Sequence, residues 1–343
     1  MNNEIQRAIN DLFNNDFMNN NVNTWKETLK KISFVPFCYT VSSINYYTSW
    51  MSDKYEEIID LSCFLRLNND IIGLWTIQLR RNLNVWQLGS NYSSIINPIF
   101  VSGISEKTKK KIMDECINKI KKICQLLCIS SIEFHTQSYT YGASLWHKKV
   151  MNLGASIVSV NHLAYVDLKL SLEELLTKFR KRYKEYVISS KKIWEVVCVD
   201  TYDEKMFEIY CNIHHIVAGK VTRGKETWNA QLNALKEGEG FLIFLFDSAQ
   251  EIIGAAFFFC SKDECYYHSG AYFRELFHLP VSHILQYSAI EYCKNKKMKY
   301  YSLGERFYTG DTFSPTDKEL SIANFKEGFS TNLFFEFKLK YEL

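Results

Sequence analysis

Short apolar runs separated by turn residues dominate the first half of the chain. The tripeptide Asn68-Asn69-Asp70 is a hairpin turn signal between two of these runs. A longer segment after the candidate N-cap Ser105 carries apolar residues at helical spacing. The pattern predicts a helix at 24–32, strands at 35–41, 58–67, 71–80 and 83–88, a helix at 105–128, a strand at 132–136, a helix at 144–153 and a strand at 156–168.

The second half opens with a clear helix start. Ser171 and Glu174 have the spacing of a capping box, in which each side chain satisfies the other residue's backbone N–H. The predicted helix continues to about residue 192 and carries a heavily basic face. Further elements are predicted as a strand at 194–199, helices at 203–216 and 227–236, and strands at 240–247 and 251–260.

The last quarter of the chain has the most informative order of elements. An apolar run at 252–260 is followed by a strand at 265–271 and a helix at 280–294 that starts at Pro280. A short strand at 300–303 then ends in Gly304. The two halves share an order of elements, so we expect an α/β protein of two tandem domains, 1–168 and 169–343. Each would hold a mixed, mostly antiparallel sheet flanked by helices.

Composition narrows the class of protein. The 343 residues are 47% apolar and 23% charged, which is ordinary for a well-cored globular protein. The net charge of +3 does not suggest a general nucleic-acid binder, although a local basic face remains compatible with it. Apolar runs fall short of the roughly 20 residues of a membrane helix, so no integral membrane segment is expected. The polar start also lacks the apolar core of a secretory signal.

Cysteine usage points to a reducing compartment. The ten cysteines include no C-x-x-C pair and are expected to be free thiols, which favours the cytoplasm. Zinc sites need closely spaced ligand pairs. The spacings of Cys260 with Cys265 and of His278 with His283 do not fit, so no metal site is expected.

The segment Phe325-Lys326-Glu327-Gly328-Phe329, placed after strand, strand, Pro-started helix and strand, carries a family resemblance. It resembles the closing half of the Fem family, the aminoacyl transferases that build peptidoglycan cross-bridges, a branch of the GNAT superfamily of acyltransferases. The basic helix at 179–186 and the helix-to-loop stretch at 213–228 also resemble that family. The chain departs from the family at Ser302, where the family has an acidic residue. A role for an acidic residue at that position is therefore not supported here. The resemblance implies two tandem GNAT-like domains.

The region that would hold the donor distinguishes branches of the superfamily. An ordinary GNAT enzyme holds the pyrophosphate of acetyl-CoA on a glycine-rich turn that leads into a helix N-terminus. Residues 272–283 occupy that place here and contain no glycine. The Fem branch also lacks this turn and takes its acyl group from an aminoacyl-tRNA. The resemblance therefore implies aminoacyl-tRNA as the donor substrate and no bound cofactor.

The acceptor implied by the resemblance is an amine of a nucleotide- or lipid-linked muropeptide, a cell-wall precursor. Two alternatives stay open at this stage. The first is a CoA-dependent N-acyltransferase that uses acetyl-CoA and acts on an amino sugar or another small amine. The second is a non-catalytic binding protein that kept the fold and lost the chemistry.

Site residues follow from the same resemblance. Lys326 would stabilise the oxyanion that forms when an amine attacks an ester, a role worth roughly 3–4 kcal/mol for a fixed donor. Phe325 would position the backbone beside it. A cleft between the domains would bind the acceptor through Arg223, Lys220 and Tyr267, since Arg and Lys suit phosphate groups. The alternative interpretation is a surface lysine and a solvated loop.

Two further sets of residues are candidates. A base is needed to remove the proton of the attacking amine, and the candidate acceptors are Glu305, Asp311 and His268. Clustered cations hold phosphate backbones, so the basic helix could form a groove for tRNA. The residues of that groove would be Lys178, Arg180 and Arg182. A solvated helix face is the alternative.

Overall fold

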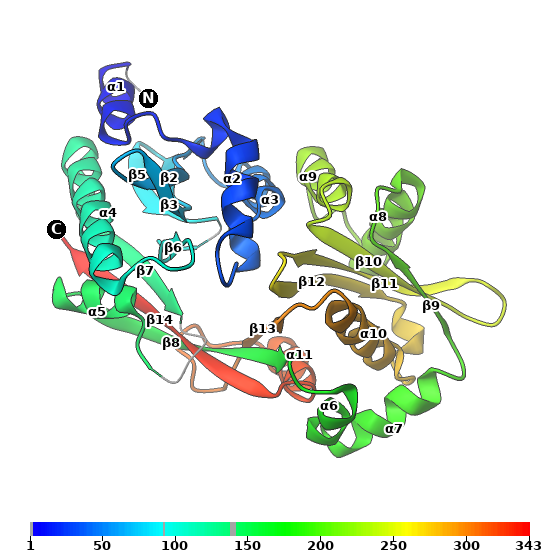
Figure 1. Cartoon of the computed structure of the whole chain (residues 1–343). Coiled ribbons are helices and arrows are strands. Elements are labelled where there is room, and N and C mark those ends of the chain that lie inside the picture. The colour runs from blue at the N-terminus through cyan, green and yellow to red at the C-terminus, as the bar shows by residue number, and fades with distance from the viewer. Residues whose placement is uncertain (1–2, 92, 138–141) are drawn as a thin grey trace. The chain divides into compact units, whose positions relative to one another are not determined.

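The computed structural model describes residues 3–91, 93–137 and 142–343. The chain forms two compact units, which are coloured along the chain in Figure 1. Unit 1 comprises Met1–Asn161 and Phe335–Leu343, and unit 2 comprises His162–Phe334. The final residues, Phe335–Leu343, therefore belong to unit 1 and not to the unit that precedes them in the sequence.

Unit 1 packs small antiparallel sheets against helices. Strands β1 (Glu57–Asp60), β4 (Gln78–Asn82) and β5 (Val85–Gly89) form one sheet, and β2 (Cys63–Leu67), β3 (Asp70–Trp75) and β6 (Ile99–Phe100) form another. Strand β7 (Ser131–Gln137) pairs with β14 (Asn332–Glu342). The helices are α1 (Asn3–Leu12), α2 (Val22–Lys30), α3 (Val41–Met51), α4 (Glu106–Leu127) and α5 (Leu145–Asn152).

Several predictions for unit 1 need correction. The strand predicted at 35–41 is wrong: a short 3-10 helix, Phe37–Tyr39, leads into α3, whose N-cap Thr40 accepts a hydrogen bond from the Ser43 N–H at 3.3 Å. Alternate apolar side chains are buried there, which imitates a strand pattern. The runs at 58–67 and 71–80 each split into two strands.

Unit 2 is built on one twisted sheet. Its strands, in spatial order, are the second half of β8 (Ser156–Asp167), β13 (Tyr300–Arg306), β12 (Glu264–Tyr272), β11 (Ile252–Cys260), β10 (Gly240–Phe246) and β9 (Glu195–Val199). Neighbours are antiparallel except β12 and β13, which are parallel. The parallel pairing joins Glu264–Tyr266 to Tyr300–Ser302. Beyond it β12 continues along β11 and β13 continues along β8, so the two strands form a fork.

Helices cover both faces of this sheet (Figure 1). Helix α8 (Glu204–Ala218) packs on the face that carries Phe257, beside α9 (Lys225–Lys236). Helix α10 (Val281–Asn295) packs on the opposite face, where the Phe241 ring lies between Phe258 and Tyr292 at 4.6 and 4.1 Å. The α10 side holds the main core of the unit.

The beginning and end of unit 2 show one confirmed prediction and two corrections. Ser171 and Glu174 form the predicted capping box. The long basic helix is broken into α6 (Leu172–Lys178) and α7 (Lys181–Ser190), because Phe179 adopts extended backbone and buries its ring. Helix α11 (Asp317–Glu327) was not predicted from the apolar pattern.

Two kinds of feature are absent from the described residues. None of their helices combines the length and the apolar composition that a bilayer crossing needs. They also contain no group of three or more His, Cys, Asp or Glu residues arranged to hold a metal.

Candidate functional site

A cavity of about 1030 Å³ opens beside the fork of β12 and β13. All residues that line it belong to unit 2. Its walls come from the end of α8 with the following loop, the second half of β12, the segment leading into α10, and α11. The splayed strands therefore create room within the unit.

The ammonium group of Lys326 lies at this fork. Its Nζ is 3.3 Å from the position a Cβ on Gly304 would occupy, and 5.7 Å from the centroid of the Tyr267 ring. Gly304 belongs to β13 and Tyr267 to β12, so the lysine reaches the point where the strands part. Gly304 has a φ of +88°, which favours glycine, and the absence of a side chain leaves space for the ammonium.

Burial changes the proton affinity of this lysine. Desolvation lowers the pKa of Lys326 to about 8, and the charge of Glu305 opposes that shift. The ammonium is thus mainly protonated at neutral pH while being poorly hydrated. A cation in such surroundings interacts strongly with negative charge that develops nearby.

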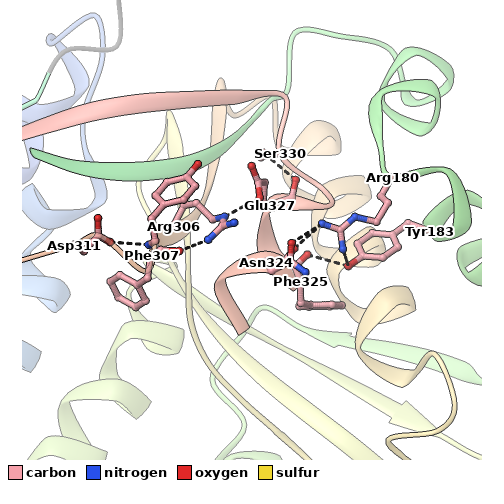
Figure 2. A network of polar contacts seen from close by, with 10 residues as sticks. Arg180, Tyr183, Arg306, Phe307, Asp311, Asn324, Phe325, Glu327 and Ser330 are labelled. Carbon is pink, nitrogen blue, oxygen red and sulfur yellow. Dashed lines mark hydrogen bonds and ion pairs between the residues drawn. The ribbon is translucent and has the colours of Figure 1, made fainter. Parts of the chain in front are cut away.

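Hydrogen bonds on both sides hold the last turn of α11, which carries Lys326 (Figure 2). On the β13 side, the Arg306 Nε donates to the Glu327 carboxylate at 2.7 Å. On the α7 side, the Arg180 guanidinium donates to the side-chain oxygen and the carbonyl of Asn324 at 2.9 and 3.0 Å. Arg306 of β13 and Arg180, the N-cap residue of α7, thereby hold the turn from two sides.

An aromatic cluster adds to this hold and explains the glycine of the Phe-Lys-x-Gly-Phe segment. The Tyr183 ring packs on Phe329 at 4.7 Å and on His283 at 4.5 Å, and its hydroxyl donates to the Phe325 carbonyl at 3.2 Å. A Cβ on Gly328 would lie 2.2 Å from the Tyr183 ring. The glycine is therefore required by the close approach of α7.

Replacing Arg180 by glutamine tests whether this residue positions α11. We expect the free energy of unfolding to fall by about 1 kcal/mol, because charge-assisted hydrogen bonds at an exposed site contribute modestly. The pKa of Lys326, followed by NMR of the labelled lysine, should rise as the turn loosens and water enters. Arg182→Gln is the matched control, since Arg182 is an exposed arginine two residues further on, in the first turn of α7. Equal effects of both variants on the Lys326 pKa would contradict the positioning role.

The structure brings part of the predicted substrate set together. Lys220 and Tyr267 line the cavity together with Phe325 and Lys326. Arg223 lies behind the wall: its guanidinium contacts the His214 Nε2 at 3.1 Å and stacks 4.7 Å from the Trp228 ring centroid. Burial, with the Arg223 charge, lowers the pKa of His214 to about 4, so this cavity residue is neutral.

The candidate proton acceptors are placed differently. Glu305 is exposed on β13, and its charge acts on Lys326. The Asp311 carboxylate accepts the Tyr308 backbone N–H at 2.7 Å. His268 packs between Phe257 and Phe259, and burial with the nearby Arg223 charge holds its pKa well below the ordinary value. Of the three, Glu305 has the direct electrostatic link to the cavity lysine.

The predicted tRNA groove residues lie on α6 and around the start of α7. Lys178 and Arg182 are exposed, whereas Arg180 uses its guanidinium in the contacts to Asn324. A role of this face in binding RNA stays a prediction.

Sequence reasoning named Tyr267 but missed Tyr272, a second tyrosine of β12 that lines the cavity. The hydroxyls of Tyr267 and Tyr272 lie 3.2 Å apart, and a Cβ on Gly270 would lie 2.3 and 2.8 Å from them. Behind them, buried Gln286 accepts a hydrogen bond from the Tyr301 hydroxyl. The glycine thus leaves two phenol groups side by side on the cavity wall. The only sequence signal for Tyr272 was its place in a tyrosine-rich strand.

Comparisons with known proteins agree with the fold. Residues 214–313 match the model of an acetyltransferase (GNAT) domain family. The crystal structure of FemX superposes with a TM-score of 0.68 at 12% identity, covering 93% of this chain and 95% of that one. No curated protein matches the sequence.

Two further structures share the fold. A C-terminal domain assigned to a lysylphosphatidylglycerol synthetase from Agrobacterium fabrum has a TM-score of 0.55 at 10% identity, covering 87% of this chain and 92% of that one. L-PGS from Bacillus licheniformis has a TM-score of 0.54 at 10% identity, covering 92% and 90%. The expected α/β class and the resemblance to the Fem branch of GNAT proteins are therefore confirmed at the level of fold.

Proposed function

We propose that this chain, which has the GNAT-type fold of FemX, is an acyltransferase that moves an aminoacyl group onto an amine bound in the cavity of unit 2. The observation that carries the proposal is the place of Lys326. Its ammonium lies at the fork of β12 and β13, and Lys326 is one of the residues that line the cavity.

The proposed chemistry uses that geometry. The amine nitrogen attacks the carbonyl carbon of the donor ester and forms an N–C bond, and the carbonyl oxygen becomes an oxyanion that Lys326 stabilises. Collapse restores the carbonyl and breaks the ester C–O bond, so that the donor hydroxyl leaves with the proton given up by the amine. Glu305 is the candidate that could carry this proton, directly or through water. The amide and the free hydroxyl of the donor are the products.

The proposed donor is an aminoacyl-tRNA rather than acetyl-CoA. The segment between β12 and α10 contains no glycine, and its residues 274–276 form a 3-10 helix. Pro280, the N-cap of α10, has no N–H, and the His283 N–H already bonds to the Pro280 carbonyl at 3.1 Å. Fewer N–H groups are left there for a pyrophosphate than at a glycine-rich turn. The name of the lysylphosphatidylglycerol synthetase, which refers to an aminoacylated lipid, supports an aminoacyl group as the unit transferred.

The proposed acceptor is an amine of a nucleotide- or lipid-linked muropeptide, with an amino sugar as the alternative. Cations at the cavity suit a phosphorylated carrier. We place the reaction in the cytoplasm, because the ten cysteines are all free in the structure.

Calorimetric titration with CoA and acetyl-CoA tests the choice of donor. We expect no detectable binding, because the segment into α10 lacks a pyrophosphate cradle. Micromolar binding would instead support the CoA-dependent N-acyltransferase. Transfer from a pool of charged tRNAs to muropeptide and amino-sugar acceptors forms the second arm. Failure of transfer with either donor would favour a non-catalytic binding protein.

A further inference from the structure

The mouth of the cavity exposes large apolar side chains. Phe277 is 65% exposed, Leu279 37% and Ile322 45%, and all three belong to the cavity lining. They come from two separate segments, the approach to α10 and helix α11. Single exposed apolar residues are common, but a group gathered at the mouth of a cavity marks an interaction surface.

Cations accompany these apolar side chains. Lys220, Arg274 and Lys318 also line the cavity and are exposed. Among the described residues that form the lining there is no aspartate or glutamate. Glu275 follows Arg274 and Asp317 precedes Lys318 in the sequence, but neither acidic residue belongs to the lining. The mouth therefore presents positive charge together with apolar surface.

We propose that this rim, defined as Lys220, Arg274, Phe277, Leu279, Lys318 and Ile322, docks on the surface of a membrane that contains anionic lipid. Apolar side chains can enter the boundary between headgroups and acyl chains, while lysine and arginine interact with the negative surface potential. The cavity would then open directly onto the lipid headgroups. The inference deepens the proposed function by making the acceptor amine a lipid-borne one, yet docking itself requires no transfer.

A membrane accounts for the rim better than a nucleic acid does. An RNA backbone would engage the three cations, and Phe277 could stack on a base. Leu279 and Ile322 would gain little from such a partner, because neither side chain can stack. A headgroup boundary uses the cations and the aliphatic side chains together, which is the composition that the rim has.

Vesicle co-sedimentation of the full chain tests the proposal. We expect binding to vesicles of phosphatidylglycerol and phosphatidylcholine, weakening with salt, and much less binding to phosphatidylcholine alone. Phe277→Ser should lower the partition coefficient by about tenfold through lost apolar burial. Lys220→Ala and Lys318→Ala should each lower it by about fivefold. Thermal unfolding of each variant would verify that the fold is kept.

Matched controls separate the rim from exposed surface in general. Leu83→Ser removes a side chain that is 79% exposed in unit 1, and Lys178→Ala removes an exposed cation on α6. Both should bind vesicles like the unaltered protein. Equal losses in rim and control variants, or no binding to anionic vesicles, would overturn the proposal. It would also be overturned if tRNA displaced the protein from vesicles and the rim variants lost tRNA affinity instead.

The docking proposal and the proposed function fail separately. Lys326→Met should bind anionic vesicles as well as the unaltered protein, because Lys326 lies at the inner fork and not on the rim. Vesicle binding without any transfer activity would contradict the proposed reaction and still support the docking surface. If the rate of transfer to a lipid-linked amine were the same in the rim variants as in the unaltered protein, only the docking proposal would be contradicted.

Discussion

Replacing Lys326 by methionine is expected to lower the rate of acyl transfer about 100- to 1,000-fold, the loss that follows removal of one oxyanion donor. Methionine keeps the length of the side chain and its contact with Tyr267, so the fold should persist. It also removes a charge from poorly hydrated surroundings. The measurement is the single-turnover rate with the donor and acceptor that the unaltered protein uses.

The matched control is Lys318→Met, because Lys318 lines the same cavity from the same helix but is exposed at its mouth. Its turnover at saturating soluble acceptor should stay within about threefold of the unaltered protein, since saturation compensates for weaker acceptor binding and a solvent-exposed charge contributes little to the chemical step. A Lys326→Met protein that kept such a rate would contradict the assigned role.

The pH dependence of the same reaction distinguishes electrostatic stabilisation from a packing role. Burial lowers the pKa of Lys326 to about 8, so the stabilising ammonium is lost as pH rises through that value. The protonated fraction would be about 90% one unit below the pKa and about 10% one unit above it. The rate should therefore fall above pH 8, and this falling limb should be missing from the residual activity of Lys326→Met. A rate that continued to rise beyond that pH would argue against a protonated lysine.

Local signals in the sequence predicted much of unit 2. The capping box of Ser171 and Glu174 and the order of strands and helix before Gly304 depend on neighbouring residues, and both are present in the structure. Helix α11 begins with an equally good capping box at Thr316 and Glu319, a local sequence signal that predicts its start. Its apolar pattern gave no help, because Ala323 is its only fully buried residue.

The geometry of the candidate site could not be predicted in the same way. The position of the Lys326 ammonium depends on β12, β13 and α11, which are separate in sequence and meet only in the folded unit. Arg180 looked like part of a phosphate-binding face because its neighbours are basic. Its bonds to Asn324 join residues that lie 144 positions apart, a contact that no local pattern shows.

Replacing Gly328 by alanine should destabilise the protein by about 3 kcal/mol, at the upper end of the cost of overpacking a core. The added Cβ would lie 2.2 Å from the Tyr183 ring and 2.8 Å from its hydroxyl oxygen, so the ring must move. Movement of Tyr183 disturbs its contacts with Phe329 and Phe325. Chemical denaturation followed by fluorescence would measure the change.

The backbone conformation of Gly328 makes the sign of the stability change in Gly328→Ala informative. Its φ of −59° and ψ of −18° are helical, and alanine in a helical conformation is favoured over glycine by about 1 kcal/mol. Propensity therefore predicts stabilisation, and only the clash with Tyr183 predicts a loss. Gly310→Ala is the control, because a Cβ there would meet nothing within 4 Å.

A second substitution identifies the clash as the cause. In a Tyr183→Ala background the ring is absent, so adding Gly328→Ala should cost little or should even stabilise the protein. The double-mutant cycle should then give a coupling of about 2–3 kcal/mol, which is typical of residues in direct contact. If Gly328→Ala were as stable as the unaltered protein, α7 and α11 would not pack as closely as described. The hold on the turn that carries Lys326 would then be weaker, and the buried, fixed ammonium on which the proposed transfer depends would lose its structural basis.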